Sequence, residues 1–143
     1  MTSKLKSLWV VLSLIGSWAC VQADDLVGLS SGEIKQLRQE GYVLVDIRTP
    51  AEWKQTGLIE GSYPLTAFDD AGHFDADRWI SDLLRVDGGQ KDHIILICRS
   101  GHRSALAGKA LLASQKLSKV YHLEKGIRGW SADGNPLSPC KNC

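Results

Sequence analysis

The chain has 143 residues, of which 43% are hydrophobic and 23% are charged, values that exclude a disordered or fibrous chain. The formal net charge is +1 and no basic block occurs, which argues against nucleic acid as a partner, because such binding needs many Lys and Arg on one face. Four cysteines are too few for a small fold built on disulfides. One globular domain with its own hydrophobic core is therefore expected.

The first 23 residues have the layout of a secretory signal peptide, with two lysines, an uncharged run over residues 8–20 and a cleavage site after Ala23. The run is shorter than the roughly 20 apolar residues of a transmembrane helix. An uncleaved anchor and a lipid on Cys20 are weaker alternatives. We therefore expect an exported protein, in a bacterium one of the periplasm, with no stable membrane span after cleavage.

Cleavage would leave residues 24–143, in which 15 basic residues stand against 16 acidic ones. Residues 24–139 are expected to form the domain and residues 140–143 a short tail. Export would place the chain in an oxidising compartment, where disulfides persist.

Signals for helices and strands alternate along the domain. Two capping boxes, Ser30 to Glu33 and Thr49 to Glu52, mark the first turns of two helices, and short apolar runs are typical of strands buried on both faces. The predicted elements are, in chain order, a helix from Ser30 to Gly41, a strand over 42–45, a helix from Thr49, a loop leading to 63–65, a helix over 77–85, a strand over 93–97, a helix over 104–113, a strand over 120–123 and a helix start over 126–130. This order predicts an α/β domain with a central, mostly parallel sheet flanked by helices.

Cys98 directly follows the strongest predicted strand, and a loop with one glycine and then a helix come after it. Ligands in such sheets bind beyond the carboxyl ends of the strands. Inward-pointing backbone N–H groups, a helix N-terminus and the charges of Arg99 and Arg103 all favour a thiolate over a thiol. The same loop would hold a small anion against the sulfur. A buried structural cysteine is the weaker alternative, because it needs neither the glycine nor the two arginines.

Four segments follow one another in a recognisable order. In chain order, residues 46–52 read DIRTPAE, residues 57–62 read GLIEGS, residues 98–104 read CRSGHRS and residues 123–136 read LEKGIRGWSADGNP. They resemble the rhodanese-like family, whose active loop C-[RK]-[SA]-G-x-R-[SA] is matched at every specified position. The family's D-x-R-x-x-x-E segment is also matched, whereas its G-H-I-P-G-A segment is degraded here.

The resemblance implies a sulfurtransferase. In the family, the loop cysteine attacks the outer sulfur of a donor such as thiosulfate, becomes a persulfide and passes that sulfur to cyanide or a thiol, in two half-reactions. It implies Cys98 as the catalytic residue and the rest of the loop as the substrate-binding residues, namely Arg99, Ser100, Gly101, His102, Arg103 and Ser104. The partners would be a small anionic sulfur donor and a thiol or cyanide acceptor, with an acceptor protein as a further option. No metal or organic cofactor is required.

Individual charged residues carry separate expectations. Arg103 is expected to close the loop and bind the anionic donor, and Arg99 to help recruit it. His102 could donate a proton, but an exposed loop histidine is the favoured reading. Asp46 and Arg48 are expected to order the loop region through a salt bridge rather than to take part in bond making. The other histidines show no metal-ligand spacing.

Cys140 and Cys143 lie beyond the segments that resemble the family. A local disulfide between them is the favoured expectation in an oxidising compartment, and a mobile dithiol that collects sulfur from Cys98 is the alternative. The tail does not open a helix as a redox motif would, and a zinc site would need a second ligand pair.

Two other functions compete with sulfur transfer. A cysteine-dependent phosphatase or arsenate reductase uses a similar loop, but with C-x5-R spacing, whereas Cys98 and Arg103 are spaced C-x4-R. A non-catalytic rhodanese-like module that binds a partner or senses redox state is the other alternative.

Overall fold

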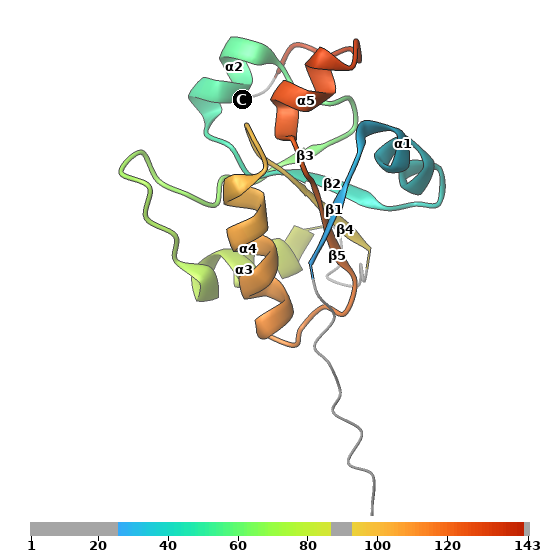
Figure 1. Ribbon diagram of the computed structural model, residues 1–143. Coiled ribbons are helices and arrows are strands. Elements are labelled where there is room, and N and C mark those ends of the chain that lie inside the picture. The colour runs from blue at the N-terminus through green and yellow to red at the C-terminus, as the bar shows by residue number, and fades with distance from the viewer. Residues whose placement is uncertain (1–25, 87–92, 142–143) are drawn as a thin grey trace, which may run out of the picture.

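The computed structural model describes residues 26–86 and 93–141, so the predicted signal peptide, Cys20 and Cys143 lie outside the described residues. A five-stranded sheet with the order β1-β5-β4-β2-β3 forms the centre of the fold (Figure 1), and all of its strand pairs are parallel. The strands are β1 (Val27–Leu29), β2 (Val43–Asp46), β3 (Tyr63–Pro64), β4 (Ile94–Ile97) and β5 (Val120–Leu123). The predicted α/β class with a parallel sheet is confirmed.

In the described part of the chain, five helices alternate with these strands. They are α1 (Ser31–Gln39), α2 (Pro50–Thr56), α3 (Ala76–Arg85), α4 (His102–Ala113) and α5 (Gly126–Ala132). Both predicted capping boxes are present, with Ser30 and Thr49 as N-caps, because each N3 glutamate returns a hydrogen bond to the cap backbone. Within the described part of the chain, no helix has the length and apolar character to cross a membrane.

The three central strands β2, β4 and β5 are covered on both faces, as their short apolar runs predict. One core cluster joins the sheet to α3 and α4, and includes Trp79, Leu83 and Leu111. The other joins the opposite face to α1 and α5, and includes Ile34, Ile127 and Trp130. Figure 1 shows these helices on either side of the strands. The strand ends are therefore the part of the sheet left open for a site.

The first strand, β1, was missed by the sequence analysis. It has three residues and pairs with Tyr121 to Leu123 at the edge of the sheet. Only Leu29 of this strand is buried, so its residues show neither a long apolar run nor an alternating pattern. Its position depends on β5, which lies more than 90 residues later in the chain.

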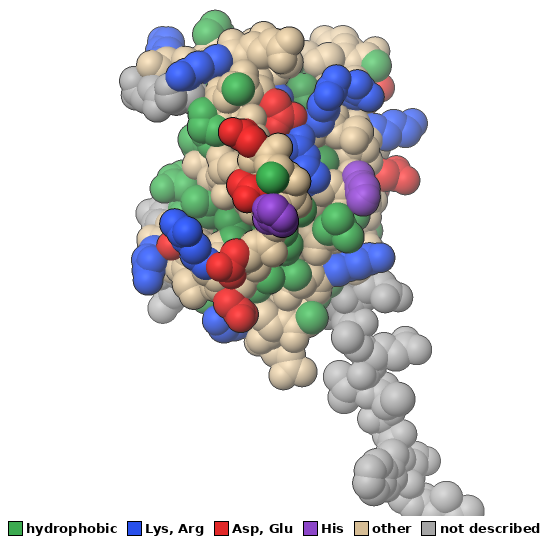
Figure 2. Space-filling model, turned by 90° about the vertical axis from the view of Figure 1, so that its left-hand side faces the viewer, with side chains coloured by type: hydrophobic (Ala, Val, Ile, Leu, Met, Phe, Trp, Pro, Cys, Tyr) green, Lys and Arg blue, Asp and Glu red, His purple; other side chains and the backbone are tan. Residues whose placement is uncertain are grey.

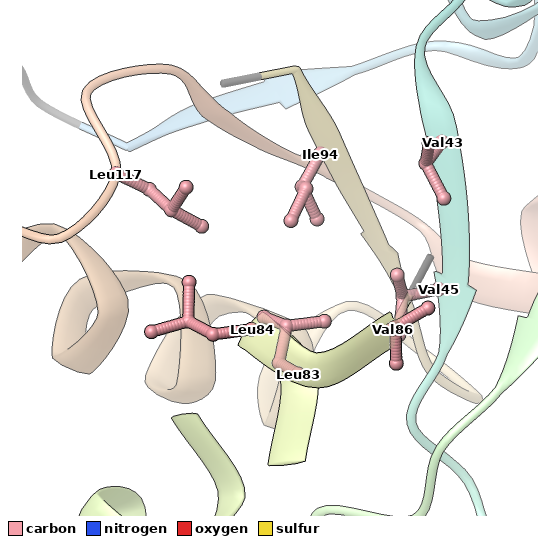
Figure 3. A pocket seen from close by; sticks show the side chains of 7 residues that line it. All are labelled: Val43, Val45, Leu83, Leu84, Val86, Ile94 and Leu117. Atoms are coloured by element: carbon pink, nitrogen blue, oxygen red, sulfur yellow. The ribbon is translucent and has the colours of Figure 1, made fainter. Parts of the chain in front are cut away.

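A small apolar cavity of about 20 Å³ lies between α3 and the sheet (Figure 3). Its lining includes Val43 and Ile94, the first residues of β2 and β4, together with Leu83 and Leu117. This end of the strands is opposite to the one that Cys98 follows. The cavity is part of the packing of the core and offers no polar group for chemistry.

Candidate active site

The carboxyl ends of β2 and β4 bring together the two segments that were singled out in the sequence. Asp46, the last residue of β2, is in register with Ile97, the last residue of β4. Backbone pairing continues one step further, because the Ile47 N–H donates to the carbonyl oxygen of Ile97 at 2.9 Å. Cys98 and Arg48 therefore leave the sheet at the same edge.

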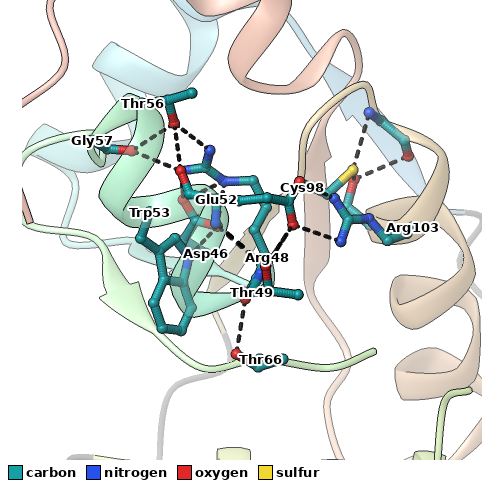
Figure 4. Close-up of polar contacts among 12 residues, drawn as sticks. Asp46, Arg48, Thr49, Glu52, Trp53, Thr56, Gly57, Thr66, Cys98 and Arg103 are labelled. Atoms are coloured by element: carbon teal, nitrogen blue, oxygen red, sulfur yellow. Dashed lines mark hydrogen bonds and ion pairs between the residues drawn. The ribbon is translucent and has the colours of Figure 1, made fainter. Parts of the chain in front are cut away.

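Asp46 and Arg48 form a buried ion pair beneath this edge (Figure 4). The guanidinium Nη2 lies 2.8 Å from the Asp46 carboxylate, and neither residue is more than 1% exposed. Arg48 also donates to Thr56 and to the Gly57 carbonyl oxygen, and the Trp53 indole N–H donates to Asp46. Each group is thus satisfied by several partners, and both residues hold α2 against β2 without reaching the sulfur.

The Sγ atom of Cys98 lies inside the loop that joins β4 to α4. The Gly101 N–H donates to Sγ at 3.1 Å, and the Ser104 hydroxyl lies 3.3 Å from it. Cys98 is 1% exposed and is a free cysteine. Two groups of the predicted loop therefore contact the sulfur directly, one from the backbone and one from a side chain. A backbone N–H and a hydroxyl both stabilise a thiolate by donating to it.

Two glycines make this loop possible. Gly101 is the N-cap of α4 with φ at 94°, and a Cβ there would collide with the carbonyl oxygen of Glu124. Gly126 has φ at 57°, and a Cβ there would meet the Cys98 carbonyl oxygen at 2.5 Å. Because Gly101 caps the helix, α4 begins at His102, two residues earlier than predicted. The Cys98 loop is thus packed directly against the turn between β5 and α5.

Arg103 is held by a partner on α2. Its guanidinium forms two hydrogen bonds with the Glu52 carboxylate, of 2.9 and 2.6 Å (Figure 4). Partial burial acts to raise the pKa of Glu52, but hydrogen bonds from Arg103 and from the Thr49 backbone outweigh it and hold that pKa below the usual range. The hydrogen bonds between Arg103 and Glu52 also raise the pKa of Arg103. Arg103 is therefore tied to α2 through Glu52, and its binding of an anionic donor stays a prediction.

Arg99, Ser100 and His102 are the exposed members of the loop. Arg99 lines a hollow of about 260 Å³ between α2 and α5, together with Arg128. Within the described residues, neither of these two guanidinium groups has a carboxylate within ion-pair distance. The hollow can therefore accept a small anion next to the loop.

A second hollow, of about 300 Å³, lies between α3 and the loop before it. Asp69, Asp75 and Asp82 line it with His73 and Arg78, and Figure 2 shows the face on which acidic and basic side chains mix in this way. No group of three or more His, Cys, Asp or Glu that could hold a metal ion occurs among the residues described.

Three residues near the loop were not singled out as site residues in the sequence. Glu52 was assigned to a capping box and to the segment over 46–52 that resembles the family, but not to the site. Arg128 was given no role, and His122 none beyond the lack of metal-ligand spacing. His122 lies 3.2 Å from the Ser104 hydroxyl, on the neighbouring strand. Their proximity depends on the pairing of strands, for which a single sequence gives no local signal.

The chain before the tail is fixed to the domain. Ser138 pairs with Leu58 through two backbone hydrogen bonds of 2.9 and 2.8 Å, and the Trp130 indole donates to the Pro136 carbonyl oxygen. Cys140 is disulfide-bonded. Its pairing with Cys143 stays a prediction, because Cys143 lies outside the described residues.

Known proteins resemble this chain over the part that contains these segments. The sequence model of the rhodanese-like domain matches residues 30–133. The chain is 32% identical over 111 residues to the thiosulfate sulfurtransferase GlpE of Pseudomonas fluorescens, covering 73% of this chain and 90% of that protein. It is 35% identical over 101 residues to a sulfurtransferase of Allochromatium vinosum, covering 68% of this chain and 79% of that protein.

Solved structures share the fold. A protein of unknown function from Rhodopseudomonas palustris, described as a possible tyrosine phosphatase, matches with a TM-score of 0.61 at 26% identity, over 79% of this chain and 85% of that one. The polysulfide-sulfur transferase homodimer of Wolinella succinogenes matches with a TM-score of 0.57 at 22% identity, over 82% of each chain. The family and the names of these sequence relatives support sulfurtransferase activity in the broad sense. On the family match and the two relatives together, the chain belongs to the rhodanese-like domain family.

Proposed function

We propose that this protein is a thiosulfate or persulfide sulfurtransferase that carries the transferred sulfur on Cys98. The observation that carries the proposal is the contact of the Cys98 Sγ with the Gly101 N–H and the Ser104 hydroxyl, at 3.1 and 3.3 Å. Both groups can donate to an anionic sulfur, so the loop favours the nucleophilic form of the cysteine.

The reaction has two displacements at sulfur. In the first, the Cys98 thiolate attacks the outer sulfur of thiosulfate; a new S–S bond forms, the bond to the sulfonate sulfur breaks, and its electron pair leaves with sulfite. In the second, cyanide or a thiolate attacks the outer sulfur of the persulfide, and the electron pair of the broken S–S bond returns to the Cys98 Sγ. The enzyme alternates between two forms, so ping-pong kinetics are expected.

The donor is proposed to be small and anionic. Cys98 is 1% exposed, so a compact donor reaches the sulfur more easily than a folded partner does. Arg99 and Arg128 line the hollow beside the loop and would attract an anion to it. Arg103 would act by holding the loop to Glu52, since its Nη1 and Nη2 atoms both donate to that carboxylate.

The decisive experiment replaces the nucleophile. Cys98→Ala should lower thiosulfate:cyanide turnover by at least about a hundredfold, because the covalent route is lost. Mass spectrometry after thiosulfate treatment should find one added sulfur atom on Cys98 of the wild-type chain. Turnover by Cys98→Ala at the wild-type rate, or added sulfur on another residue of the wild-type chain, would overturn the assignment of Cys98. Hydrolysis of a phosphate monoester in a parallel assay would support the phosphatase alternative, and no turnover of either substrate would support a binding module.

We also propose that the protein is exported and cleaved after Ala23. The support is the order of charged, apolar and small residues over residues 1–23, which lie outside the described part of the structure. The mature N-terminus of protein purified from its native source should be Asp24. An N-terminus at Met1 in the soluble fraction would contradict export.

A further inference from the structure

A buried histidine stands behind the reactive loop. His122 lies on β5, is 9% exposed and has its Nδ1 atom 3.2 Å from the Ser104 hydroxyl oxygen. That oxygen is in turn 3.3 Å from the Cys98 Sγ. The three side chains thus form a continuous hydrogen-bonded chain from the sulfur to the imidazole, although they come from β5, α4 and the loop between β4 and α4.

The single hydroxyl hydrogen of Ser104 has three acceptors within reach. These are the Gly101 carbonyl oxygen at 3.0 Å, the Cys98 Sγ and the His122 Nδ1. When Nδ1 carries no hydrogen, it competes for the Ser104 hydrogen, and the thiol can then donate to the Ser104 oxygen. When Nδ1 carries a hydrogen, it donates to the Ser104 oxygen and leaves the hydroxyl hydrogen free to point at sulfur.

We propose that His122 is a positioning residue for Cys98 and acts through the Ser104 hydroxyl, so that a protonated imidazole increases the thiolate fraction of Cys98. When the thiol ionises beside a neutral imidazole, the proton that it loses is taken up within these three side chains. The S–H bond breaks and leaves its electron pair on sulfur, the proton passes to the Ser104 oxygen, and the Ser104 proton passes to Nδ1. The products are a thiolate that accepts from Ser104 and an imidazolium that donates to Ser104.

The other imidazole nitrogen, Nε2, faces the surface. A Cβ on Gly28 would lie 3.3 Å from Nε2 and 3.2 Å from the Glu124 side chain, and Gly28 itself is exposed. Nε2 is therefore close to solvent at the edge strand β1, whereas Nδ1 points to the buried Ser104. The imidazole can exchange its proton with water on one side while it contacts the reactive loop on the other.

The charges around His122 decide the pH range of the effect. Burial lowers the pKa of His122, the nearby Glu124 carboxylate acts against this, and the Lys109 ammonium on α4 adds to it. The neighbouring strands β1 and β4 present no charged residue, because Val27–Leu29 and Ile94–Ile97 are all uncharged. A pKa lowered from its usual value leaves the imidazole neutral near about pH 8, and the ring becomes charged only below that lowered pKa.

The size of the effect follows from the distance. The two contacts, 3.3 and 3.2 Å, keep Sγ and Nδ1 within about 6.5 Å of each other. Two opposite unit charges at that distance change an equilibrium by about threefold even at the dielectric constant of water, and by more in a partly buried site. Protonation of His122 should therefore raise the ratio of thiolate to thiol at Cys98 at least about threefold.

The test measures the ratio of thiolate to thiol directly and does not require sulfur transfer. The functional meaning of the hydrogen bonds from Cys98 to His122 rests on the proposed function. The ultraviolet absorbance of the thiolate is followed against pH for the full-length chain, for His122→Asn and for the control His73→Asn, each corrected by the matching Cys98→Ser protein. Asn keeps a hydrogen-bonding amide near the position of Nδ1 but cannot become charged. His73 is an exposed histidine paired with Asp69 on another part of the surface.

Below the midpoint of the His122 ring, read from its NMR titration, the wild-type and His73→Asn ratios should exceed that of His122→Asn at least about threefold. The three should agree near about pH 8, where the imidazole is neutral. Parallel curves for wild type and His122→Asn at all pH values would overturn the proposal. If His122→Asn does not fold, NMR titration of the His122 ring in wild type and in Cys98→Ser gives the same answer, because coupling is reciprocal. Equal midpoints in those two proteins would equally overturn it. Loss of sulfur transfer with the coupling intact would count against the proposed function alone.

Discussion

Glu52 on α2 and Arg103 on α4 are 51 residues apart in the chain and are joined by two hydrogen bonds of 2.9 and 2.6 Å. Glu52 has a second task, because its carboxylate also accepts from the Thr49 N–H in the capping box of α2. One carboxylate therefore fixes the start of α2 and the first turn after the Cys98 loop. The geometry of the loop depends on a residue that lies outside it.

Glu52→Gln should destabilise the protein by about 1–2 kcal/mol and lower thiosulfate turnover, because charge-assisted hydrogen bonds to Arg103 are replaced by weaker ones. Urea unfolding at neutral pH and steady-state assays measure the two effects. Glu33→Gln is the matched control, since Glu33 occupies the same N3 position in the capping box of α1 and is exposed. Equal losses for the two variants would mean that the capping box, and not Arg103, accounts for the effect.

Replacement of Arg103 separates charge from shape. Arg103→Ala should lower turnover more than Arg103→Lys, because Lys keeps one ionic hydrogen bond to Glu52 but loses the planar fork that makes two. The comparison uses kcat and KM for thiosulfate in both variants. Equal losses would indicate that the charge of Arg103 contributes nothing to the loop.

The Glu52–Arg103 pair should also weaken in acid. Because the folded-state pKa of Glu52 lies below its unfolded value, the pair contributes stability above about pH 4.3 and loses it as pH falls through the lowered pKa. The difference in unfolding free energy between wild type and Glu52→Gln should be constant from neutral pH to about pH 5.5 and shrink below about pH 4. A difference that persists unchanged in acid would contradict the assigned ionisation of Glu52.

Arg48→Ala should cost about 3–5 kcal/mol, because it leaves the buried Asp46 carboxylate without its cation. Urea unfolding measures the loss. Arg85→Ala serves as the control, since Arg85 forms an exposed pair with Asp82 and such pairs contribute about 0–1 kcal/mol. A loss at Arg48 no larger than at Arg85 would show that the Asp46 carboxylate is adequately satisfied by Trp53 and the backbone.

Gly101→Ala should lower the free energy of unfolding by more than the cost of an alanine in a left-handed backbone conformation. Gly134 provides the comparison, because its φ is 75° and a Cβ there would meet nothing within 4 Å. Gly134→Ala should cost about 1 kcal/mol for the left-handed conformation alone, whereas Gly101→Ala must also displace the Glu124 carbonyl. Unfolding free energies that match would mean that the turn after β5 yields easily.

The sequence predicts what is local in this molecule. Both capping boxes, the strand β5 and the position of Cys98 at the end of β4 need only neighbouring residues, and the structure has all of them. Strand β1 has three residues and one buried side chain, so it carries no periodic signal. It exists because β5 offers an edge for it to pair with.

The contacts around the sulfur also divide into those that neighbouring residues determine and those that distant elements provide. Residues 98–104 identify the loop, but the Glu52 partner of Arg103 and the His122 partner of Ser104 come from other elements. Their positions follow from strand order, in which β4 lies between β2 and β5. That order is a property of the whole sheet, and no spacing along one chain encodes it.

We expect Cys140 and Cys143 to be joined and to be dispensable for thiosulfate:cyanide turnover. Cys140 is disulfide-bonded, and two intervening residues allow the sulfurs to meet. Closing so short a loop adds little stability, because the gain from loop closure falls with loop length. The pairing of Ser138 with Leu58 also fixes the chain two residues before Cys140, which limits the reach that a sulfur relay would need.

The Cys140→Ser, Cys143→Ser double variant tests this expectation, first with cyanide and then with a dithiol acceptor protein. Unchanged turnover with both acceptors would support a structural disulfide. Unchanged cyanide turnover with a large fall in transfer to the dithiol protein would favour the relay, as would free thiols at both positions in protein isolated without reductant. Loss of cyanide turnover itself would contradict both readings, because it would require the tail to support the Cys98 loop, whereas the chain just before the tail pairs with Leu58, beside α2.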